Sequence, residues 1–453
     1  MTETMIDSQV DSSYFVVHLG IQSQPFTWFQ RNAKGLISRH KEMFDESFRL
    51  WKTLYVLGYG DVIGRLSERA KQRLELLFGR IGSERSLFLL NTYYGTVISL
   101  LTNRLEERLG MPPNRTLVNE PLLWVVNESE EVRDYYLREA ERLICLLMSS
   151  PAAQTGEVSE TDFLKPLYES LFPREVRHDL GEYYTPRYLA ECAIQSLEIA
   201  KTADKTVLDP ACGSGIFLKV IIKRKISEMK KSQYHPDEIV HKILATVSGI
   251  DINPLAAESA RFNYLLSLLS LLQSRLHWDF KIPVFLGDSI EISKTNARLR
   301  DTGFLRLGVS KVDLLVGNPP WVSWGNLTEE VRESWKETYV TPYRLLKDTG
   351  QRASLGHSND DISIPFVWVA TDRYLKIGGR AAFILKRTIL QGAAGKLFRS
   401  FSIDRLGIPL RIIRIHDLSD LRPFGNGGGS ETAVISFEFG KRTRFPIDCT
   451  VWE

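Results

Sequence analysis

The sequence is poor in the residues that build metal sites and disulfide frameworks. Its four cysteines, Cys145, Cys192, Cys212 and Cys449, lie far apart without a CxxC pair, and none of its eight histidines forms an HxxxH spacing. Closely spaced cysteine and histidine pairs are the usual signature of zinc sites, and cysteine-rich frameworks belong to secreted proteins. We therefore expect a protein of a reducing compartment that holds no metal.

Long apolar runs and a strong charge of one sign are also lacking. The longest apolar run, Tyr264 to Leu272, is about half as long as a membrane-spanning helix of ~20 residues, and no basic start with an apolar core marks a leader. The formal net charge is only +3, so any basic surface for nucleic acid must be local. We expect a soluble, cytoplasmic protein without a membrane partner.

The chain of 453 residues is long enough for about two or three domains of ~150 residues each. Apolar residues recur at three- and four-residue spacing in the first part, so residues 1–150 are expected to form a helical N-terminal domain. The small, polar and proline-bearing stretch that follows predicts a linker at 151–160, and residues 161–453 should form a second domain. The helices expected in the first domain are 36–57, 63–78, 87–108 and 132–148.

The second part of the chain alternates strand-like and helix-like segments, the pattern of a parallel sheet with crossover helices. This pattern predicts an α/β fold with a doubly wound, seven-stranded sheet. Because no helix-length segment joins the last two strands, one of them should run antiparallel. The expected strands are 206–211, 247–253, 283–287, 312–317, 381–385, 411–416 and 432–439.

A short apolar run that begins at Asp313 stops abruptly at Asn318-Pro319-Pro320-Trp321. The run predicts a buried strand, and the two prolines prevent the strand from continuing. A side-chain amide, two backbone carbonyls and an indole are thus held at the carboxyl end of a strand, where open α/β sheets bind ligands. This arrangement suits the binding of a planar base that carries an amino group. A strand followed by a simple Pro-Pro turn is the plain alternative.

Earlier in the chain, Val207 to Phe217 predicts a strand, a glycine turn and a helix. Gly213 and Gly215 allow a tight turn and the close approach of a ligand to the backbone. The spacing is not GxGxxG and no P-loop lysine follows the glycines. Because the carboxylate of Asp209 precedes the turn, the site suits the amino-acid end of a ligand better than a pyrophosphate. An ordinary strand-to-helix turn is the alternative.

Two further strand ends carry an acidic residue. Asp251 ends the second strand, a position from which a carboxylate can accept both hydroxyls of a ribose, although such a residue could equally cap a helix. Asp288 ends the third strand and could accept a hydrogen bond from an adenine amino group, or belong to an ordinary turn. Three successive strand ends with an acid or glycines together favour a cofactor made of a nucleoside and an amino acid.

These motifs, together with Gly181-Glu182-Tyr183-Tyr184-Thr185-Pro186, resemble those of the S-adenosylmethionine-dependent DNA N6-adenine methyltransferases in the gamma-type order. The resemblance covers about residues 180–440 and includes a helix at 362–379 and a fifth strand at 380–386. It implies a Rossmann-like methyltransferase sheet, S-adenosylmethionine as the cofactor, and methyl transfer to adenine N6 in DNA by base flipping and direct in-line attack. The N-terminal part is only loosely similar to the helical regions of large restriction–modification methylases.

The resemblance also implies roles for individual residues. A catalytic role falls to Asn318, Pro319, Pro320 and Trp321. Trp321 would stack on the flipped base together with Phe424, which precedes the glycine-rich segment Gly425–Ser430. The residues assigned to the cofactor are Tyr184, Thr185, Pro186, Asp209, Ala211, Gly213, Gly215, Phe217, Asp251, Ile252, Asp288 and Ser289.

Two other functions fit the same motifs. RNA methyltransferases that act on guanine N2 or adenine N6 share the Asp-Pro-x-Cys-Gly-Ser-Gly and Asn-Pro-Pro-aromatic strings, although the element at 181–186 favours DNA. A non-catalytic DNA-binding subunit could retain the fold, but the intact Asn318 and the intact glycine turn argue against it. DNA methylation is therefore the preferred interpretation.

The resemblance also bears on partners. Gamma-type relatives carry a target-recognition domain after the catalytic domain, whereas only about a dozen residues follow the last expected strand here. We therefore expect sequence specificity to come from a separate specificity subunit, from the helical domain, or from a continuation of the chain. This would fit the modification component of a restriction or anti-phage defence system that acts on DNA.

Overall fold

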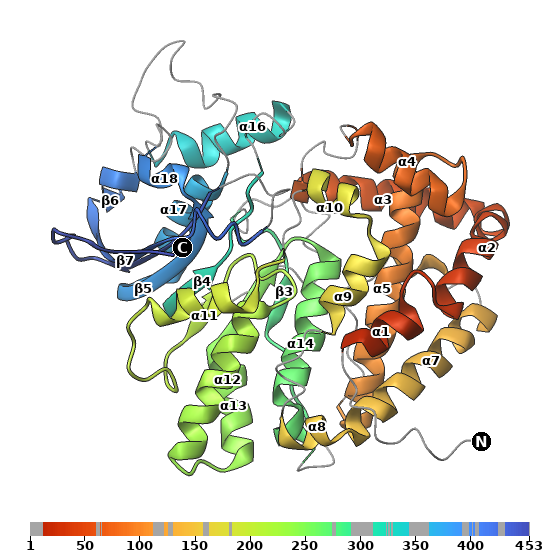
Figure 1. Cartoon of the computed structure of the whole chain (residues 1–453), viewed down its shortest axis with the longest axis horizontal. Helices are drawn as coiled ribbons and strands as arrows, with labels where there is room; N and C mark the ends of the chain where they lie inside the picture. The colour runs from red at the N-terminus through yellow and green to blue at the C-terminus, as the bar shows by residue number, and fades with distance from the viewer. Residues whose placement is uncertain are drawn as a thin grey trace.

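The computed structural model shows one large sheet beside a block of helices (Figure 1). Its described strands form a single nine-stranded sheet in the order β3-β2-β1-β4-β5-β8-β7-β6, with β9 paired to β7. The residues that the structure describes are 12–59, 64, 66–111, 122–125, 130–156, 163–180, 184–273, 278–290, 311–322, 324, 327, 329–343, 362–391, 398–400, 402–403, 407–424 and 431–452.

All seven strands expected from the sequence are present. The strands β1 to β5 are parallel, and β8 is antiparallel to both of its neighbours, β5 and β7, so β8 is the expected antiparallel strand. Two further strands, β6 and β9, pair with β7; with two and four residues they are too short to give a periodic apolar pattern. The strands are β1 (Val207–Asp209), β2 (Val247–Asp251), β3 (Val284–Leu286), β4 (Val312–Gly317), β5 (Leu375–Lys386), β6 (Ser402–Ile403), β7 (Ile408–Asp417), β8 (Thr432–Phe439) and β9 (Asp448–Val451).

The sheet separates two apolar cores because successive strand side chains point to opposite faces. In β4, Leu314 and Val316 belong to one core and Leu315 to the other. In the sheet region, the helices that pack in the first core are α11 (Arg187–Gln195), α12 (Ile216–Lys231), α13 (Pro236–Thr246) and α14 (Pro254–Leu272). The second core includes residues of α16 (Glu329–Trp335), α17 (Ser363–Tyr374) and α18 (Thr388–Gln391), and the remaining short elements are η4 (Lys336–Val340) and η6 (Phe398–Ser400).

The fifth strand begins earlier than the sequence indicates. The helix expected at 362–379 ends at Tyr374, and β5 starts at the next residue. Leu375 pairs with Val312 and Arg380 with Leu314, so the register shifts and residues 376–379 bulge from the strand. The expected strand at 381–385 lies inside the regular part that follows.

The N-terminal region is helical, as expected. The helix expected at 36–57 is two helices that meet at His40, where φ −116° and ψ 41° leave the helical conformation. The helix expected from position 63 begins at Glu68, because the Ser67 side chain caps it by accepting the Ala70 N–H at 3.3 Å. None of the described helices has the length and apolarity needed to cross a bilayer. The helices are α1 (Ser12–Leu19), α2 (Gln24–Arg39), α3 (Lys41–Tyr59), α4 (Glu68–Phe78), α5 (Ser83–Arg108), α7 (Glu130–Ser149), α8 (Pro151–Thr155), α9 (Leu164–Leu171) and α10 (Arg174–Leu180).

The stretch expected as a linker begins with the short helix α8. The Ser150 side chain accepts the Ala153 N–H at 3.3 Å and Pro151 occupies the first turn, which favours a helix start. α8 contacts both α7 and α14. The rest of the stretch, from residue 157, lies outside the described residues, and a domain boundary here remains a prediction.

The helical region and the sheet region share one apolar core. α14 lies between the sheet and the helical block and contacts α5 (Figure 1). In this contact Arg261 of α14 forms a buried ion pair with Glu106 of α5, and the Tyr94 hydroxyl lies 3.1 Å from Ser259 Oγ. The helical region is thus packed against the sheet region over a buried interface.

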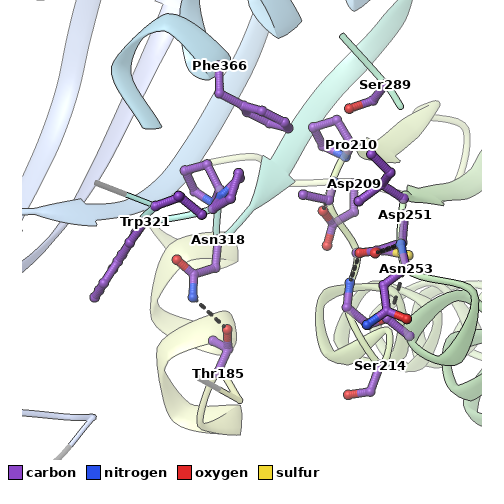
Figure 2. A pocket seen from close by; sticks show the side chains of 18 of the residues that line it. Thr185, Asp209, Pro210, Ser214, Asp251, Asn253, Ser289, Asn318, Trp321 and Phe366 are labelled. Atoms are coloured by element: carbon purple, nitrogen blue, oxygen red, sulfur yellow. Dashed lines mark hydrogen bonds between the residues drawn. The ribbon is translucent and has the colours of Figure 1, made fainter. Parts of the chain in front are cut away.

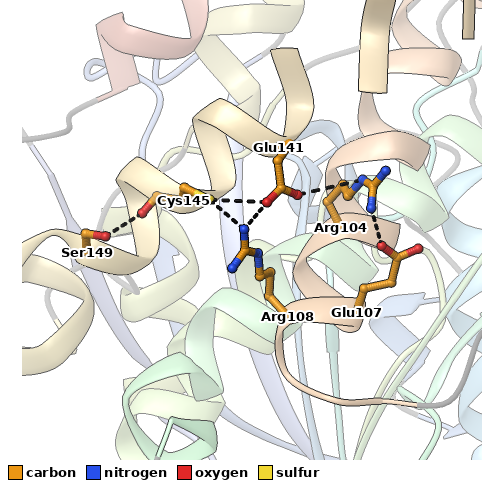
Figure 3. A network of polar contacts seen from close by, with 6 residues as sticks. All are labelled: Arg104, Glu107, Arg108, Glu141, Cys145 and Ser149. Atoms are coloured by element: carbon orange, nitrogen blue, oxygen red, sulfur yellow. Dashed lines mark hydrogen bonds and ion pairs between the residues drawn. The ribbon is translucent and has the colours of Figure 1, made fainter. Parts of the chain in front are cut away.

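A second network joins α5 to α7 near the surface (Figure 3). Arg108 donates hydrogen bonds to Glu141 and, at 3.1 Å, to Cys145 Sγ. The bond from Arg108 holds the pKa of Glu141 below its usual value. Half-exposed pairs of this kind contribute at most ~1 kcal/mol each, so apolar burial is the main source of stability between these helices.

Candidate active site

A cavity of about 260 Å³ lies at the carboxyl ends of β1, β2, β3 and β4 (Figure 2). Neighbouring parallel strands end at the same edge of a sheet, which is why motifs far apart in sequence meet here. Pro186, Gly215 and Phe424 do not line the cavity but adjoin residues that do, while 181–183 and 425–430 lie outside the described residues. The expected site residues that line it are Tyr184, Thr185, Asp209, Ala211, Gly213, Phe217, Asp251, Ile252, Asp288, Ser289, Asn318, Pro319, Pro320 and Trp321.

The glycine turn between β1 and α12 is fixed from several sides. Cys212 N donates to the Ile250 carbonyl at 2.9 Å, and Asn263 Nδ2 donates to the Ser214 carbonyl at 2.9 Å. Gly215 has a φ of +86°, and a Cβ there would come within 3.1 Å of Ala260. Only glycine meets both conditions without strain. The turn is therefore held in one conformation where it lines the cavity.

Asp209, the last residue of β1, has an unsatisfied carboxyl oxygen. Its Oδ1 accepts the Ala211 N–H at 3.1 Å, whereas its buried Oδ2 has no hydrogen-bond partner among the residues that the structure describes. Burial raises the pKa of this carboxyl well above its usual value, and the nearby Asp251 raises it further. A cationic donor such as an ammonium group would satisfy Oδ2 and favour the ionised form. The site therefore fits the amino group of an amino-acid ligand.

Asp251 and Asp288 lie at the ends of β2 and β3. Asp251 Oδ2 accepts the Gly213 N–H at 2.8 Å and its Oδ1 accepts the Asn253 N–H at 2.9 Å. Burial raises the pKa of Asp251 to about 6, although these backbone bonds oppose the shift. Asp288 Oδ1 accepts the Ile290 N–H at 2.8 Å. Each carboxylate oxygen can accept more than one bond, so both groups can also receive ligand hydroxyl or amino hydrogens.

Asn318 follows the last residue of β4 and also has an unsatisfied acceptor. Its Nδ2 donates to Thr185 Oγ1 at 3.2 Å, while its buried Oδ1 has no hydrogen-bond partner within the described part of the chain (Figure 2). The Trp321 and Phe424 rings meet edge to face, with centroids 5.0 Å apart and planes at 82°. An amide acceptor beside two aromatic rings can hold a planar ligand that carries an amino group.

Three cavity residues of the helical region were not expected: Tyr94 of α5, Tyr168 of α9 and Leu180 of α10. Tyr168 links the other aromatic residues, with its ring centroid 5.3 Å from Tyr94 and 5.4 Å from Tyr184. Buried helical tyrosines look like ordinary core residues in a sequence, so no local signal distinguishes them. Phe366 and Trp335, which are mostly buried and also line the cavity, were missed for the same reason.

The fold and the cavity together define a doubly wound α/β protein with its cavity across the strand ends, the place where open α/β sheets bind ligands. The chain belongs to the N-6 DNA methylase family, whose model matches residues 159–404, more than half of the chain. The resemblance inferred from the sequence motifs is thus confirmed at the level of the family.

Curated relatives are similar over part of their length. The type II methyltransferase M.BstVI of Geobacillus stearothermophilus is 22% identical over 232 residues, which cover 50% of this chain and 36% of the relative. The methylase subunit of the type I restriction enzyme MjaVIII of Methanocaldococcus jannaschii is 28% identical over 162 residues, covering 35% and 23%. The adenine-specific methyltransferase PglX of Streptomyces coelicolor is 24% identical over 233 residues, covering 43% and 19%. The chain thus matches about a third or less of each relative.

Among solved structures, a nuclease-deletion mutant of the type ISP restriction–modification enzyme LlaGI, in complex with a DNA substrate mimic, is similar with a TM-score of 0.57. The match covers 92% of this chain and 35% of that chain at 14% identity. Because the match covers nearly the whole chain, the fold similarity includes the N-terminal helices as well as the sheet. At this identity the likeness concerns the fold alone.

Proposed function

We propose that this chain transfers a methyl group from S-adenosylmethionine to the N6 amino group of an adenine in DNA. The observation that carries the proposal is the buried Oδ1 of Asn318, an acceptor that lacks a partner among the described residues and lies beside Trp321. Family membership and the adenine-specific relative support the same reaction. An amino group inside a duplex is out of reach, so the base must flip into the cavity.

Three acidic residues would hold the cofactor. The unsatisfied Asp209 Oδ2 suits its ammonium group, and Asp251 and Asp288 suit its ribose hydroxyls and adenine amino group. The sheet order β3-β2-β1-β4 places these residues in a row that ends at Asn318. S-adenosylmethionine supplies a methyl group on a positively charged sulfur.

Asn318 and Pro319 would activate the base. The lone pair of the adenine amino nitrogen is delocalised into the ring, which makes this nitrogen a weak nucleophile. If Asn318 Oδ1 and the Pro319 carbonyl accept its two hydrogens, electron density stays on the nitrogen, and Trp321 holds the ring plane. The nitrogen then forms a bond to the methyl carbon, the carbon–sulfur bond breaks with its electron pair on sulfur, and a proton leaves the nitrogen for water. Correct placement of the reacting atoms supplies much of the acceleration.

The proposal is tested by expressing the chain in a host without adenine methylation and measuring N6-methyladenine in DNA and RNA by mass spectrometry. We expect methylated DNA from the wild type and a loss of about 10²–10³-fold for Asn318→Ala, the usual effect of removing one such polar contact. Asn32→Ala, on a helix that does not line the cavity, is the matched control. Methylation in RNA alone, or unchanged DNA methylation by Asn318→Ala, would overturn the proposal.

We also propose that the chain takes its target sequence from another subunit or domain. The support is that one relative is named as the methylase subunit of a restriction enzyme and that the chain matches about a third or less of each curated relative. Methylation mapping with the purified chain alone should then find no single target motif. Full methylation of one defined motif by the isolated chain would show that no partner is needed.

A further inference from the structure

The segment before α11 and the end of β4 meet at one hydrogen bond. Asn318 Nδ2 donates to Thr185 Oγ1 at 3.2 Å, and these residues are 133 positions apart in sequence (Figure 2). Both residues line the cavity. Thr185 therefore contacts the Asn318 amide, which accepts a hydrogen bond from the adenine amino group in the proposed reaction. The inference below rests on that proposed function.

An asparagine amide can present either its oxygen or its nitrogen to a ligand, because a half turn exchanges the two at almost equal shape. A threonine hydroxyl can bond to either group, as an acceptor from Nδ2 or as a donor to Oδ1. Only the first arrangement leaves Oδ1 for the amino group of a base. In the second arrangement Asn318 Nδ2 would face the amino group of the base. Both groups are donors, so both would be unsatisfied, which costs ~1–3 kcal/mol per buried group.

The arrangement of Asn318 therefore depends on where the Thr185 hydroxyl hydrogen goes. When Thr185 Oγ1 accepts from Asn318 Nδ2, its own hydrogen is left for an acceptor other than Asn318, and a ligand in the cavity that Thr185 lines can supply one. In the proposed reaction the row of acidic residues from β3 to β1 would place the nucleoside of the cofactor toward Asp288 and its amino-acid end toward β4 and Thr185. Among the described residues that line the cavity none is a lysine or arginine, so a ligand carboxylate there would rely on neutral donors.

We propose that the cofactor's carboxylate accepts the Thr185 hydroxyl hydrogen and thereby fixes the Asn318 amide with Oδ1 toward the base. Thr185 is then a positioning residue that couples the two binding sites. Cofactor binding prepares the grip on the adenine amino group, and a base that arrives without cofactor meets an amide free to take either orientation.

The helical region packs against the segment 184–186, which carries Thr185. The Tyr184 ring lies 5.4 Å from the Tyr168 ring of α9, and Tyr168 lies 5.3 Å from Tyr94 of α5. On the other side of Thr185, the Pro186 carbonyl accepts the Leu189 N–H at 3.0 Å in the first turn of α11. Thr185 is thus anchored on both sides, as a residue that orients a neighbour must be.

The coupling is measured by binding, without methyl transfer. The affinity for 2′-deoxyadenosine is determined by ligand-detected NMR in the presence of S-adenosylhomocysteine, or of its decarboxylated analogue, which keeps the amino group. For the wild type we expect the carboxylate to raise the affinity at least ~5-fold, within the usual range of coupling between sites. Purine 2′-deoxyriboside, which lacks the amino group, should show no such gain.

Two variants distinguish coupling from a structural role. Thr185→Val keeps the shape but removes the hydroxyl and should abolish the carboxylate-dependent gain; Thr185→Ser keeps the hydroxyl and should restore it. In the methylation assay at saturating cofactor, Thr185→Val should lower kcat by up to about 100-fold, and Thr185→Ser should recover most of it. Thr53→Val, an exposed threonine of α3 that bonds the Arg49 carbonyl, is the matched control.

The coupling would be overturned if the carboxylate raised the affinity for 2′-deoxyadenosine as much in Thr185→Val as in the wild type. It would also be overturned if the carboxylate raised the wild-type affinity for purine 2′-deoxyriboside equally. Failure of the wild type to methylate DNA would instead overturn the proposed function, and the binding data would still decide the coupling. The two failures are therefore distinguishable.

Discussion

Gly317 lies directly against Asp209: a Cβ atom at position 317 would come within 2.7 Å of Asp209 Oδ1. The two residues end the neighbouring parallel strands β4 and β1. Only a residue without a side chain leaves room for the buried carboxyl at this point. The residue before Asn318 therefore determines whether the acidic group and the amide can share one cavity.

Gly317→Ala should weaken cofactor binding while the fold is kept. The added methyl group must displace the Asp209 carboxyl or the end of β4, and overpacking of this kind costs typically 1–3 kcal/mol, or about 5- to 150-fold in affinity. Calorimetric titration with S-adenosylhomocysteine measures the change. Gly35→Ala is the control: its nearest neighbour is Arg39 Nη1 at 4.0 Å, and alanine should stabilise helix α2 by roughly 0.5–1 kcal/mol. Unchanged affinity for Gly317→Ala would contradict the close contact.

Stability of the ligand-free protein should fall as pH rises from about 4 to about 6 through the ionisation of Asp251. Burial raises the pKa of this group from 3.8 to about 6, so over this interval the folded protein holds a proton that the unfolded chain has lost. Asp251→Asn should flatten this part of the profile, measured by urea unfolding at several pH values.

Asp204 provides a control of opposite sign for the pH profile. The hydrogen bond from Lys242 lowers the pKa of Asp204, so its ionised form stabilises the folded protein above its ordinary pKa, and this contribution is lost as pH falls. Asp204→Asn should therefore lower stability near neutral pH and have less effect in acid. Equal pH slopes for the wild type and Asp251→Asn would show that Asp251 is not the group responsible.

Phe424→Ala should reduce methylation efficiency, because the Trp321 ring loses the aromatic ring that packs against it. The two rings form an edge-to-face pair at 5.0 Å, an arrangement worth about 0.5–1.5 kcal/mol, so kcat/KM should fall roughly 2- to 10-fold. Cofactor affinity should not change, because Phe424 does not line the cavity. Phe445→Ala, at a phenylalanine that is 73% exposed, is the matched control. A loss of cofactor affinity equal to the loss of activity would assign Phe424 to the cofactor instead.

Arg261→Met should destabilise the whole protein. Arg261 pairs with Glu106 across the α5–α14 contact and lies 4.0 Å from Glu258, and both carboxyl groups are buried. Removing one partner of a buried ion pair typically costs about 3–5 kcal/mol, and Glu106→Gln in the same chain should recover part of it. Lys336→Met, in an exposed pair with Glu333, should cost less than ~1 kcal/mol by denaturant unfolding. Equal effects of the two single variants would contradict the structural role of the buried pair.

The sheet and the strand-end motifs could be predicted because their signals are local. An apolar run and two prolines within a few residues predict the position of Asn318 at a strand end. A strand followed by a helix start does the same for Asp251. β9 gave no such signal, because three of its four residues are exposed and the strand is added to the sheet by pairing with β7. Short exposed strands of this kind form through tertiary contacts that no sequence window contains.

The contribution of the helical region to the cavity could not be predicted for a related reason. Tyr94 is fully buried on a helix in which every residue from 86 to 99 is buried, so periodicity does not tell which face meets the cavity. The Thr185–Asn318 bond likewise joins residues 133 positions apart. Such pairs become visible only when the chain is folded.

The burial of α14 has a consequence for engineering. In this helix 16 of 19 residues are buried, since the sheet lies on one side and α5 on the other. A fragment that begins after residue 160 would expose a long apolar surface to water, and it would also lose Tyr94, whose ring lies 5.3 Å from that of Tyr168 behind Tyr184. A transplant of the sheet and its cavity into another protein must therefore carry the N-terminal helices with it.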